Sequence, residues 1–248
     1  MAVFAISDLH LSTANMQKSM DVFGQRWSMY TDRLEKNWKA IVNENDTVII
    51  PGDISWELSL EAASSDFHFI ERLPGKKIIG KGNHDFWWST AKKMTEFFEH
   101  ESIKTISLLH NNAYLVEDFV IAGTRGWYHD EHCENIPSNT DFEKLIAREA
   151  LRLKTSLNQA VALRDTNGGN KEILVFLHFP VVWNEKTCLP LLDLLESYQI
   201  KRCYFGHIHA NYSQPRVLHI KDDLRLELIS SDFLEFIPQI IRPISAKT

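Results

Sequence analysis

Side chains able to bind metal ions follow a series of short apolar runs in this 248-residue sequence. In the clearest case, residues 77–80 lead through Gly82 to Asn83, His84 and Asp85. A β-branched run, a glycine and then polar residues indicate a strand that delivers a loop at its carboxyl end. The side chains found at such places are Asp8, His10, Asp53, Asn83, His84, His178, His207 and His209.

This set of side chains has the composition of a transition-metal site. Aspartate, asparagine and histidine suit Mn, Fe, Co, Ni or Zn better than calcium, and the set is too large for one ion. Asp8 and His10 are two residues apart, as are His207 and His209, so each pair can point to one side of an extended segment. With Asp53 bridging through its two oxygens, the pairs would form a dinuclear site with ions about 3.5 to 4 Å apart.

The charge of such a site predicts its ligand. Two carboxylates leave positive charge on two divalent or trivalent ions, because histidine and asparagine ligands are neutral. An anion is therefore the expected guest. A hydroxide bridging the ions would be a nucleophile at neutral pH, and the metals would hold the oxygens of a phosphoryl group during its displacement. Carboxylic substrates could be held in a similar way, so this alternative stays open.

The elements before these side chains predict a mostly parallel sheet. Apolar runs at residues 2–7, 47–50 and 77–80 have strand length, and helical spacing of apolar residues fills 27–43 and 58–73 between them. An apolar strand, a polar tip and a helix recur, which is typical of right-handed βαβ units. The strand ends would then converge on one edge of the sheet, where open α/β sheets place their sites.

The later part of the chain continues this pattern less regularly. We expect a polar loop without assigned structure over residues 123–139 and a single domain over residues 1–248. The other expected elements are a helix over 89–100, a hairpin of 114–116 and 119–122, a long helix from Phe142 to about 167, a strand over 173–177, a helix through Leu191 and Leu195, a strand over 203–205, and a hairpin of 216–220 and 224–229 around Asp222 and Asp223.

Composition limits the partners and the compartment. With 44% apolar and 24% charged residues the chain can bury a substantial core, and its net charge of -6 argues against long nucleic acids and membrane surfaces as partners. The three cysteines form no CxxC pair, which favours a reducing compartment. The apolar run 2–6 is too short for a signal peptide or a membrane span, so we expect a cytoplasmic protein.

The polar blocks also resemble those of a known superfamily. In chain order they are Asp8-Leu9-His10, Gly52-Asp53, Gly82-Asn83-His84-Asp85, His178 and Gly206-His207-Ile208-His209. Their order and rough spacing resemble the calcineurin-like metallophosphoesterases. The resemblance implies an α/β fold, a four-layer α-β-β-α sandwich of two mixed sheets with the metal site at the carboxyl ends of the strands.

The resemblance also implies roles for these residues. The first metal ion would take Asp8, His10, Asp53 and His209, and the second would take Asp53, Asn83, His178 and His207. His84 would sit beside the phosphate, where it would stabilise the transition state or protonate the leaving oxygen. The acid that would orient His84 and the arginine that would grip the phosphate are missing from the places that the resemblance implies. In their stead we expect Glu57 or Asp85 to orient His84 and Arg125 to grip the phosphate.

The chain also departs from the protein Ser/Thr phosphatases of the superfamily. Those resemble Gly-Asp-x-x-Asp-Arg-Gly in the second block, whereas this chain continues Gly52-Asp53 with Ile54-Ser55-Trp56-Glu57, and it has Asp85 where they have Glu. The resemblance therefore predicts hydrolysis of a small phosphorylated substrate, a nucleotide included, as a monoester or a diester. The alternatives are a protein phosphatase and a metal-binding scaffold without turnover.

Four tryptophans fall within a few residues after a proposed ligand. They are Trp56, Trp87, Trp88 and Trp183. Two interpretations stay open: the rings pack the sheet edge and the loops, as large aromatic residues usually do, or they form a stacking wall for a flat group such as a nucleobase.

Overall fold

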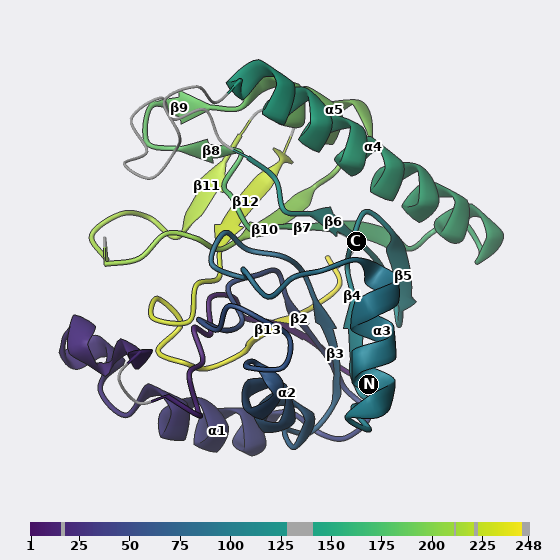
Figure 1. Ribbon diagram of the computed structural model, residues 1–248. Helices are drawn as coiled ribbons and strands as arrows, with labels where there is room; N and C mark the ends of the chain where they lie inside the picture. Colours follow the sequence, from purple (N-terminus) through teal and green to yellow (C-terminus); the bar gives the residue numbers. More distant parts are fainter. Residues whose placement is uncertain (16–17, 128–140, 211, 221–222, 245–248) are drawn as a thin grey trace.

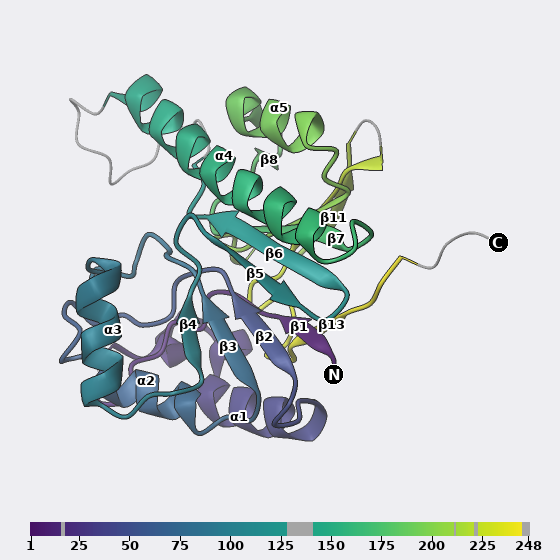
Figure 2. The same ribbon diagram turned by 90° about the vertical axis from the view of Figure 1, so that its right-hand side faces the viewer.

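The computed structural model describes residues 1–15, 18–127, 141–210, 212–220 and 223–244. Two sheets pack face to face with helices on both outer sides, as the side view in Figure 2 shows. Figure 1 places α1, α2 and α3 on one side of the pair and α4 and α5 on the other. The four-layer α-β-β-α sandwich predicted above is therefore confirmed.

The first sheet has the strand order β13-β1-β2-β3-β4. Strands β1 to β4 run parallel to one another, and β13 pairs antiparallel with β1 at the edge of the sheet. The bounds are β1 Val3–Ala5, β2 Thr47–Ile50, β3 Lys76–Ile79, β4 Ile106–Leu108 and β13 Gln239–Ile241. The helices that cover it are α1 Tyr30–Ile41, α2 Ser64–Glu71 and α3 Ala91–His100.

The second sheet has the order β11-β12-β10-β7-β6-β5. Its four central strands run parallel, and the two outer strands are antiparallel to their neighbours. The bounds are β5 Ala113–Val116, β6 Phe119–Thr124, β7 Glu172–Leu177, β10 Arg202–Phe205, β11 Val217–His219 and β12 Arg225–Leu228. The covering helices are α4 Phe142–Thr166 and α5 Leu189–Ser197. A short pair, β8 Val182–Trp183 and β9 Lys186–Thr187, lies apart from both sheets.

Alternating side chains of each central strand enter different parts of the core. In β1, Val3 and Ala5 join the layer between the sheets, whereas Phe4 packs with the helices on the outer face. In β7, Phe176 lies between the sheets and Val175 packs under α4 and α5. Because both faces are buried, these strands are continuous apolar runs, which is why they could be recognised in the sequence.

Some expected elements differ in extent or were not predicted. The helix expected over 58–73 is α2, which begins only at Ser64. Residues 60–63 before it form a turn, and the N–H of Ala63 donates to the carbonyl of Ser59. Strands β4, β8, β9 and β13 were missed, since each is two or three residues long. Both expected hairpins are present, although Asp222 and most of the polar loop, residues 128–139, lie outside the described residues.

None of the helices in the described part of the chain is both long enough and apolar enough to cross a bilayer.

Candidate metal centre

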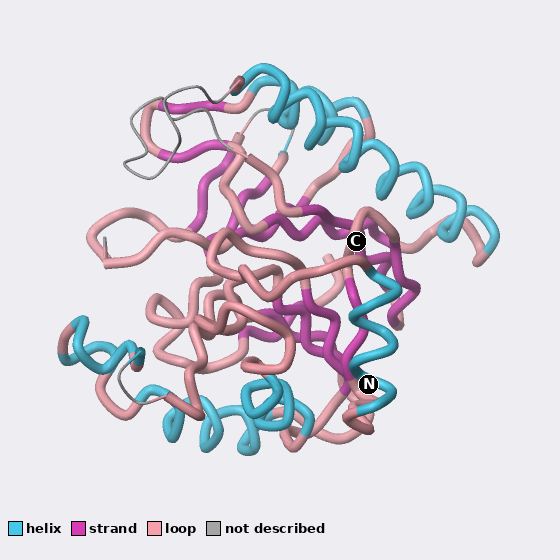
Figure 3. The backbone as a smooth tube through the Cα atoms, viewed as in Figure 1, coloured by secondary structure: helices cyan, strands magenta, loops and turns pink. Residues whose placement is uncertain are grey.

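The predicted ligands lie in loops at the carboxyl ends of strands from both sheets. Figure 3 shows the loops gathered at one edge of the two sheets. The loops after β1 and β2 carry Asp8, His10 and Asp53, and the loop after β3 carries Asn83. The second sheet contributes the loops after β7 and β10, with His178, His207 and His209. Because the strands run parallel, their ends meet at this edge.

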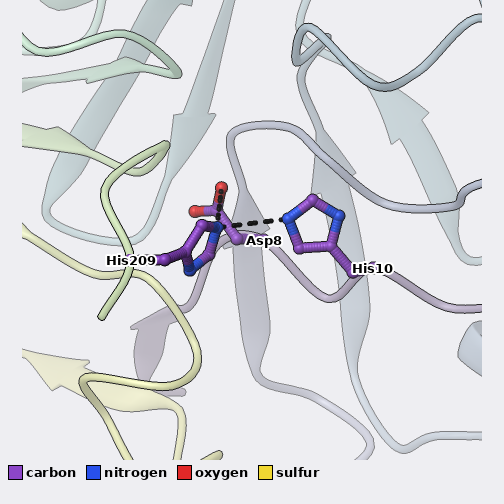
Figure 4. Close-up of side chains that lie close together, drawn as sticks. All are labelled: Asp8, His10 and His209. Atoms are coloured by element: carbon purple, nitrogen blue, oxygen red, sulfur yellow. Dashed lines mark hydrogen bonds and ion pairs between the residues drawn. The ribbon is translucent and has the colours of Figure 1, made fainter. Parts of the chain in front are cut away.

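One cluster of possible ligands consists of Asp8, His10 and His209, whose ligand atoms all lie within 4.8 Å of one another (Figure 4). Nε2 of His209 is 3.5 Å from Oδ1 of Asp8 and 3.2 Å from Nε2 of His10. In each of these two contacts, one residue follows a strand of the first sheet and the other, His209, follows a strand of the second. The cluster therefore depends on the packing of the whole sandwich.

A second cluster shares Asp8 with the first and adds Asp53 and His178. Oδ2 of Asp53 lies 3.4 Å from Nε2 of His178 and 3.6 Å from Nε2 of His10. This oxygen therefore stands between a histidine of each cluster. Asp8 is only 4.0 Å from Nδ1 of His178.

Asn83 extends the second cluster. Its Oδ1 lies 2.7 Å from Nε2 of His178 and 2.9 Å from Nδ1 of His207. An amide oxygen and two imidazole nitrogens thus face one another beside Asp53. The structure brings all seven predicted metal ligands to one place.

The backbone of four of these residues is strained. The φ angles of Asp8, His10, Asp53 and His207 are 59°, 45°, 51° and 71°. A non-glycine residue with positive φ costs about 1 to 3 kcal/mol, and such residues cluster at functional sites. Their side chains are brought inward at this cost.

Glycine is required beside the strained residues. A Cβ on Gly82 would lie 2.0 Å from Oδ1 of Asp53, and one on Gly206 would lie 2.2 Å from Oδ2 of Asp8. Both distances are far below any real Cβ contact. The carboxylates can approach these loops only because the loops carry glycine there.

The protonation states suit a cation. Burial holds the pKa values of His10 and His178 well below the usual range and that of His207 at about 4, so these rings are neutral at pH 7 and each keeps a nitrogen lone pair. Burial, then the carboxylates of Asp85 and Asp8, raises the pKa of Asp53 well above its usual range. A cation next to these oxygens would favour the ionised carboxylate.

Two buried ring nitrogens, Nδ1 of His10 and Nδ1 of His178, have no hydrogen-bond partner among the described residues. Such orphaned polar atoms are rare in protein interiors and mark functional sites. Asp8, Asp53 and His178 are at most 1% exposed, so water cannot replace the missing partners freely. The donor set, the neutral imidazoles of His10, His178 and His207 and the crowded carboxylates fit transition-metal ions.

The carboxylate of Asp85 binds the backbone of the ligand loops and not the ring of His84. Its oxygens accept hydrogen bonds from the backbone N–H groups of Gly82, Asp53 and Ile54 at 2.7 to 2.9 Å, and from Nε1 of Trp87 at 3.1 Å. Burial raises its pKa to about 6 despite these bonds. Glu57, the other residue expected to orient His84, instead bonds Nζ of Lys18 at 2.8 Å.

His84 is held by an aromatic ring. Its imidazole lies 4.2 Å from the ring of Trp56 between centroids, and Trp56 stacks on His10 at 4.7 Å. The backbone N–H of His84 donates to Oδ1 of Asp53 at 2.8 Å. His84 therefore stands at the rim of the ligand cluster, half-buried, with its position set by Trp56 and Asp53.

Asp232 belongs to the site but was not predicted. Its Oδ1 accepts a hydrogen bond from Nδ1 of His209 at 2.9 Å. Burial lowers the pKa of His209, but Asp232 and Asp8 outweigh it and raise the value to about 10. The sequence did carry a signal, because Ser230, Ser231 and Asp232 form a polar tip directly after a predicted strand.

The four tryptophans do not form one wall. Trp87 is 2% exposed and packs on Phe67 in the core, and Trp56 packs on two histidines. Trp183 packs with the core under α5, and Trp88 packs against the core beside Trp87. The packing interpretation fits all four, and Trp88 and Trp183 each also line a pocket.

The fold and site together define a class of protein, the two-sheet α/β sandwiches with candidate metal ligands at the strand ends. A profile of the calcineurin-like phosphoesterases matches residues 1–211, so the chain belongs to the calcineurin-like phosphoesterase family. Membership of this family supports metal-dependent hydrolysis of phosphoesters.

Individual relatives are more distant. The chain is 27% identical over 139 residues to the uncharacterized protein MJ1445 of Methanocaldococcus jannaschii, covering 54% of this chain and 73% of that protein. Its fold is similar to TT1561 of Thermus thermophilus, with a TM-score of 0.55, 10% identity, and coverage of 93% and 89% of the two chains. It is also similar to the phosphopantetheinyl hydrolase PptH of Mycobacterium tuberculosis, with a TM-score of 0.50, 13% identity, and coverage of 98% and 96%.

Proposed function

We propose that this protein hydrolyses phosphate esters of small molecules, nucleotides included, with the help of two bound metal ions. One observation carries the proposal: two clusters of possible ligands share Asp8, and Oδ2 of Asp53 lies between His178 of one and His10 of the other, at 3.4 and 3.6 Å. Two neighbouring ion sites with common carboxylates are the arrangement of two-metal phosphoester hydrolases.

The contacts support a division of the ligands between the ions. Asp8, His10, Asp53 and His209 would hold the first ion, and Asp53, Asn83, His178 and His207 the second. Ions such as Mn, Fe, Zn, Co or Ni suit these donors. When bound, they supply an activated water at neutral pH and positive charge for the phosphoryl oxygens.

His84 supplies a hydrogen bond beside the ions. Burial lowers its pKa, so the neutral imidazole, which carries one ring N–H, prevails at pH 7. That N–H would donate to a phosphoryl oxygen or to the leaving oxygen of the ester. Trp56 and the Asp53 contact orient the ring, and Asp85 positions the loops of Asp53 and Gly82 through their backbone N–H groups.

The proposal takes residues 1–248 as a single domain. Two contacts support this: β13 pairs with β1, and Asp232 hydrogen-bonds His209, the candidate ligand in the loop after β10. Two alternatives make different predictions. A scaffold without turnover would bind the metals and hydrolyse nothing. A protein phosphatase would prefer phosphorylated protein to small esters.

The test is hydrolysis of p-nitrophenyl phosphate and bis-p-nitrophenyl phosphate by metal-stripped protein with Mn²⁺ added back. We expect turnover to return with Mn²⁺ and to fall at least 100-fold in Asp53→Asn and in His84→Ala. His100→Ala, an exposed histidine on α3, is the matched control and should retain full activity. Stoichiometric metal binding without turnover of either ester would establish the scaffold instead.

A further inference from the structure

A pocket of about 540 Å³ lies beside the candidate metal centre, and none of the described residues that line it is acidic. Four cations line it: Lys81, Arg125, Arg148 and Arg152. On a chain with a net charge of -6, this is a local concentration of positive charge. Such a concentration attracts an anion.

The pocket touches the ligand loops without including a ligand. Lys81 directly precedes Gly82 and Asn83, and the carbonyl of Arg125 accepts the backbone N–H of His178 at 2.9 Å. None of the seven metal-ligand candidates lines the pocket. A group bound there would therefore lie next to the metal centre, in addition to any group held by the metals.

The pocket wall has hydrogen-bond donors that are not used. Nε of Arg125 and Nε1 of Trp88 are buried and have no partner among the described residues. The Arg125 guanidinium is held over the ring of Trp127, with 4.9 Å between Cζ and the ring centroid. A positioned guanidinium with a free N–H is suited to a phosphate oxygen.

The charges of the pocket are only partly balanced. Glu149 lies behind the wall and pairs with Arg152 at 2.5 Å, and its other oxygen accepts from Thr124 at 3.0 Å. Lys81, Arg125 and Arg148 have no such ion pair among the described residues.

The size of the pocket also matters. Pockets of about 300 to 1,000 Å³ hold small organic molecules rather than single ions. The rings of Trp88 and His110, 5.7 Å apart between centroids, add apolar surface to the cationic wall. The pocket therefore suits an organic substituent that ends in an anion.

The geometry points to a substrate that carries a second phosphate group, bound by Lys81, Arg125, Arg148 and Arg152 while the scissile phosphoester lies at the metal centre. This inference rests on the proposed function for the identity of the metal-bound group. It names the substrate class as a small phosphoester with a second, remote phosphate. Hydrolysis leaves that second phosphate intact, since no metal ligand reaches it.

The test compares thymidine 5'-monophosphate with thymidine 3',5'-bisphosphate, which differ only in one remote phosphate. Their affinities for the Mn²⁺-loaded protein are measured by isothermal titration calorimetry. We expect the bisphosphate to bind at least tenfold more tightly, and Arg148→Gln to reduce this ratio at least threefold. Lys154→Gln, an exposed cation on the same helix outside the pocket, should keep the wild-type ratio.

Equal affinities of wild-type protein for the two nucleotides, or a ratio that Arg148→Gln leaves unchanged, would overturn the inference. So would the absence of binding of both. The proposed function fails separately. If neither p-nitrophenyl phosphate nor bis-p-nitrophenyl phosphate is hydrolysed, but the bisphosphate still binds more tightly and this preference depends on Arg148, the anion pocket stands and the hydrolase does not.

Discussion

Asp232 fixes the orientation of one imidazole in the candidate metal centre. By accepting the Nδ1 proton of His209 at 2.9 Å, it leaves Nε2 to face Asp8 and His10. It is fully buried and is itself held by the hydroxyl of Tyr212 at 2.9 Å. Carboxylates in this position set the tautomer of metal-binding histidines and raise their basicity.

We predict that Asp232→Asn weakens Mn²⁺ binding by about 10- to 100-fold, since the amide no longer enforces the tautomer of His209. Competition with a fluorescent chelator measures the affinity. Asp193→Asn, at an exposed position of α5, is the control and should bind as the wild type does. An unchanged affinity in folded Asp232→Asn would show that Asp232 has only a structural role.

The residue types of the site could be predicted, but their supporting contacts could not. Asp8, His10 and Asp53 were recognisable because their spacing after apolar runs repeats. Asp232 was missed because a single aspartate after Ser230 and Ser231 is equally typical of a turn. Aspartate adopts a positive φ more readily than most residues, but residue type alone does not say which aspartates do so. The positive φ angles of Asp8 and Asp53 accompany tertiary contacts such as the hydrogen bond from the backbone N–H of Asp8 to the carbonyl of Gly52.

At the scale of elements, a buried lysine joins a strand to a helix. Lys77 of β3 is 0% exposed, and its Nζ donates to the carbonyl of Leu73, just beyond the end of α2, and to Oγ1 of Thr105 at 3.1 Å. Cations are favourable at helix C-termini. Burial nevertheless lowers its pKa from the usual 10.5 to about 8.

This lowered pKa predicts a pH dependence of stability. Between pH 8 and 10.5 the unfolded chain keeps a proton on Lys77 that the folded chain loses, so the free energy of unfolding of wild type rises with pH relative to Lys77→Met, by up to about 3 kcal/mol. Urea unfolding at several pH values measures the difference. Exposed Lys76→Met is the control, and a wild-type curve parallel to that of Lys77→Met would contradict the prediction.

The parallel strands were predictable because both of their faces are buried. After a first polar residue, Thr47 and Glu172, β2 and β7 are unbroken apolar runs. By contrast, β4 and β13 have only three residues each. They are strands because they pair with β3 and β1, and this pairing cannot be recognised from a short stretch of sequence. The shortened α2 reflects the turn after Leu58, where apolar spacing continues although the backbone is not helical.

At the scale of the whole molecule, bound metal should hold the two sheets together. The candidate ligands come from both sheets, and the carboxylates of Asp8 and Asp53 are buried among imidazoles of the other sheet. A ligand that binds only the folded state stabilises it by mass action. Metal would therefore contribute to the stability of the entire sandwich.

We predict that Mn²⁺ at about 100 times its Kd raises the melting temperature by roughly 5 to 10 °C over protein in EDTA. Differential scanning calorimetry measures the shift. In Asp53→Asn, which loses the carboxylate between His10 and His178, the shift should shrink by at least half. A melting temperature that is indifferent to EDTA would argue against metal binding by the folded protein.

The contact between Asp8 and the loop after β10 has a consequence for biosynthesis. The backbone N–H of His207 donates to Asp8 across 199 residues, and Ser230 reaches the same carboxylate across 222. A ribosome has therefore made residues 1–230 before this site can assemble. Until then the nascent chain carries Asp8 and His10 without their partners, so any metal that this site binds is taken up after residue 230 has been made, from the metals present where the chain folds.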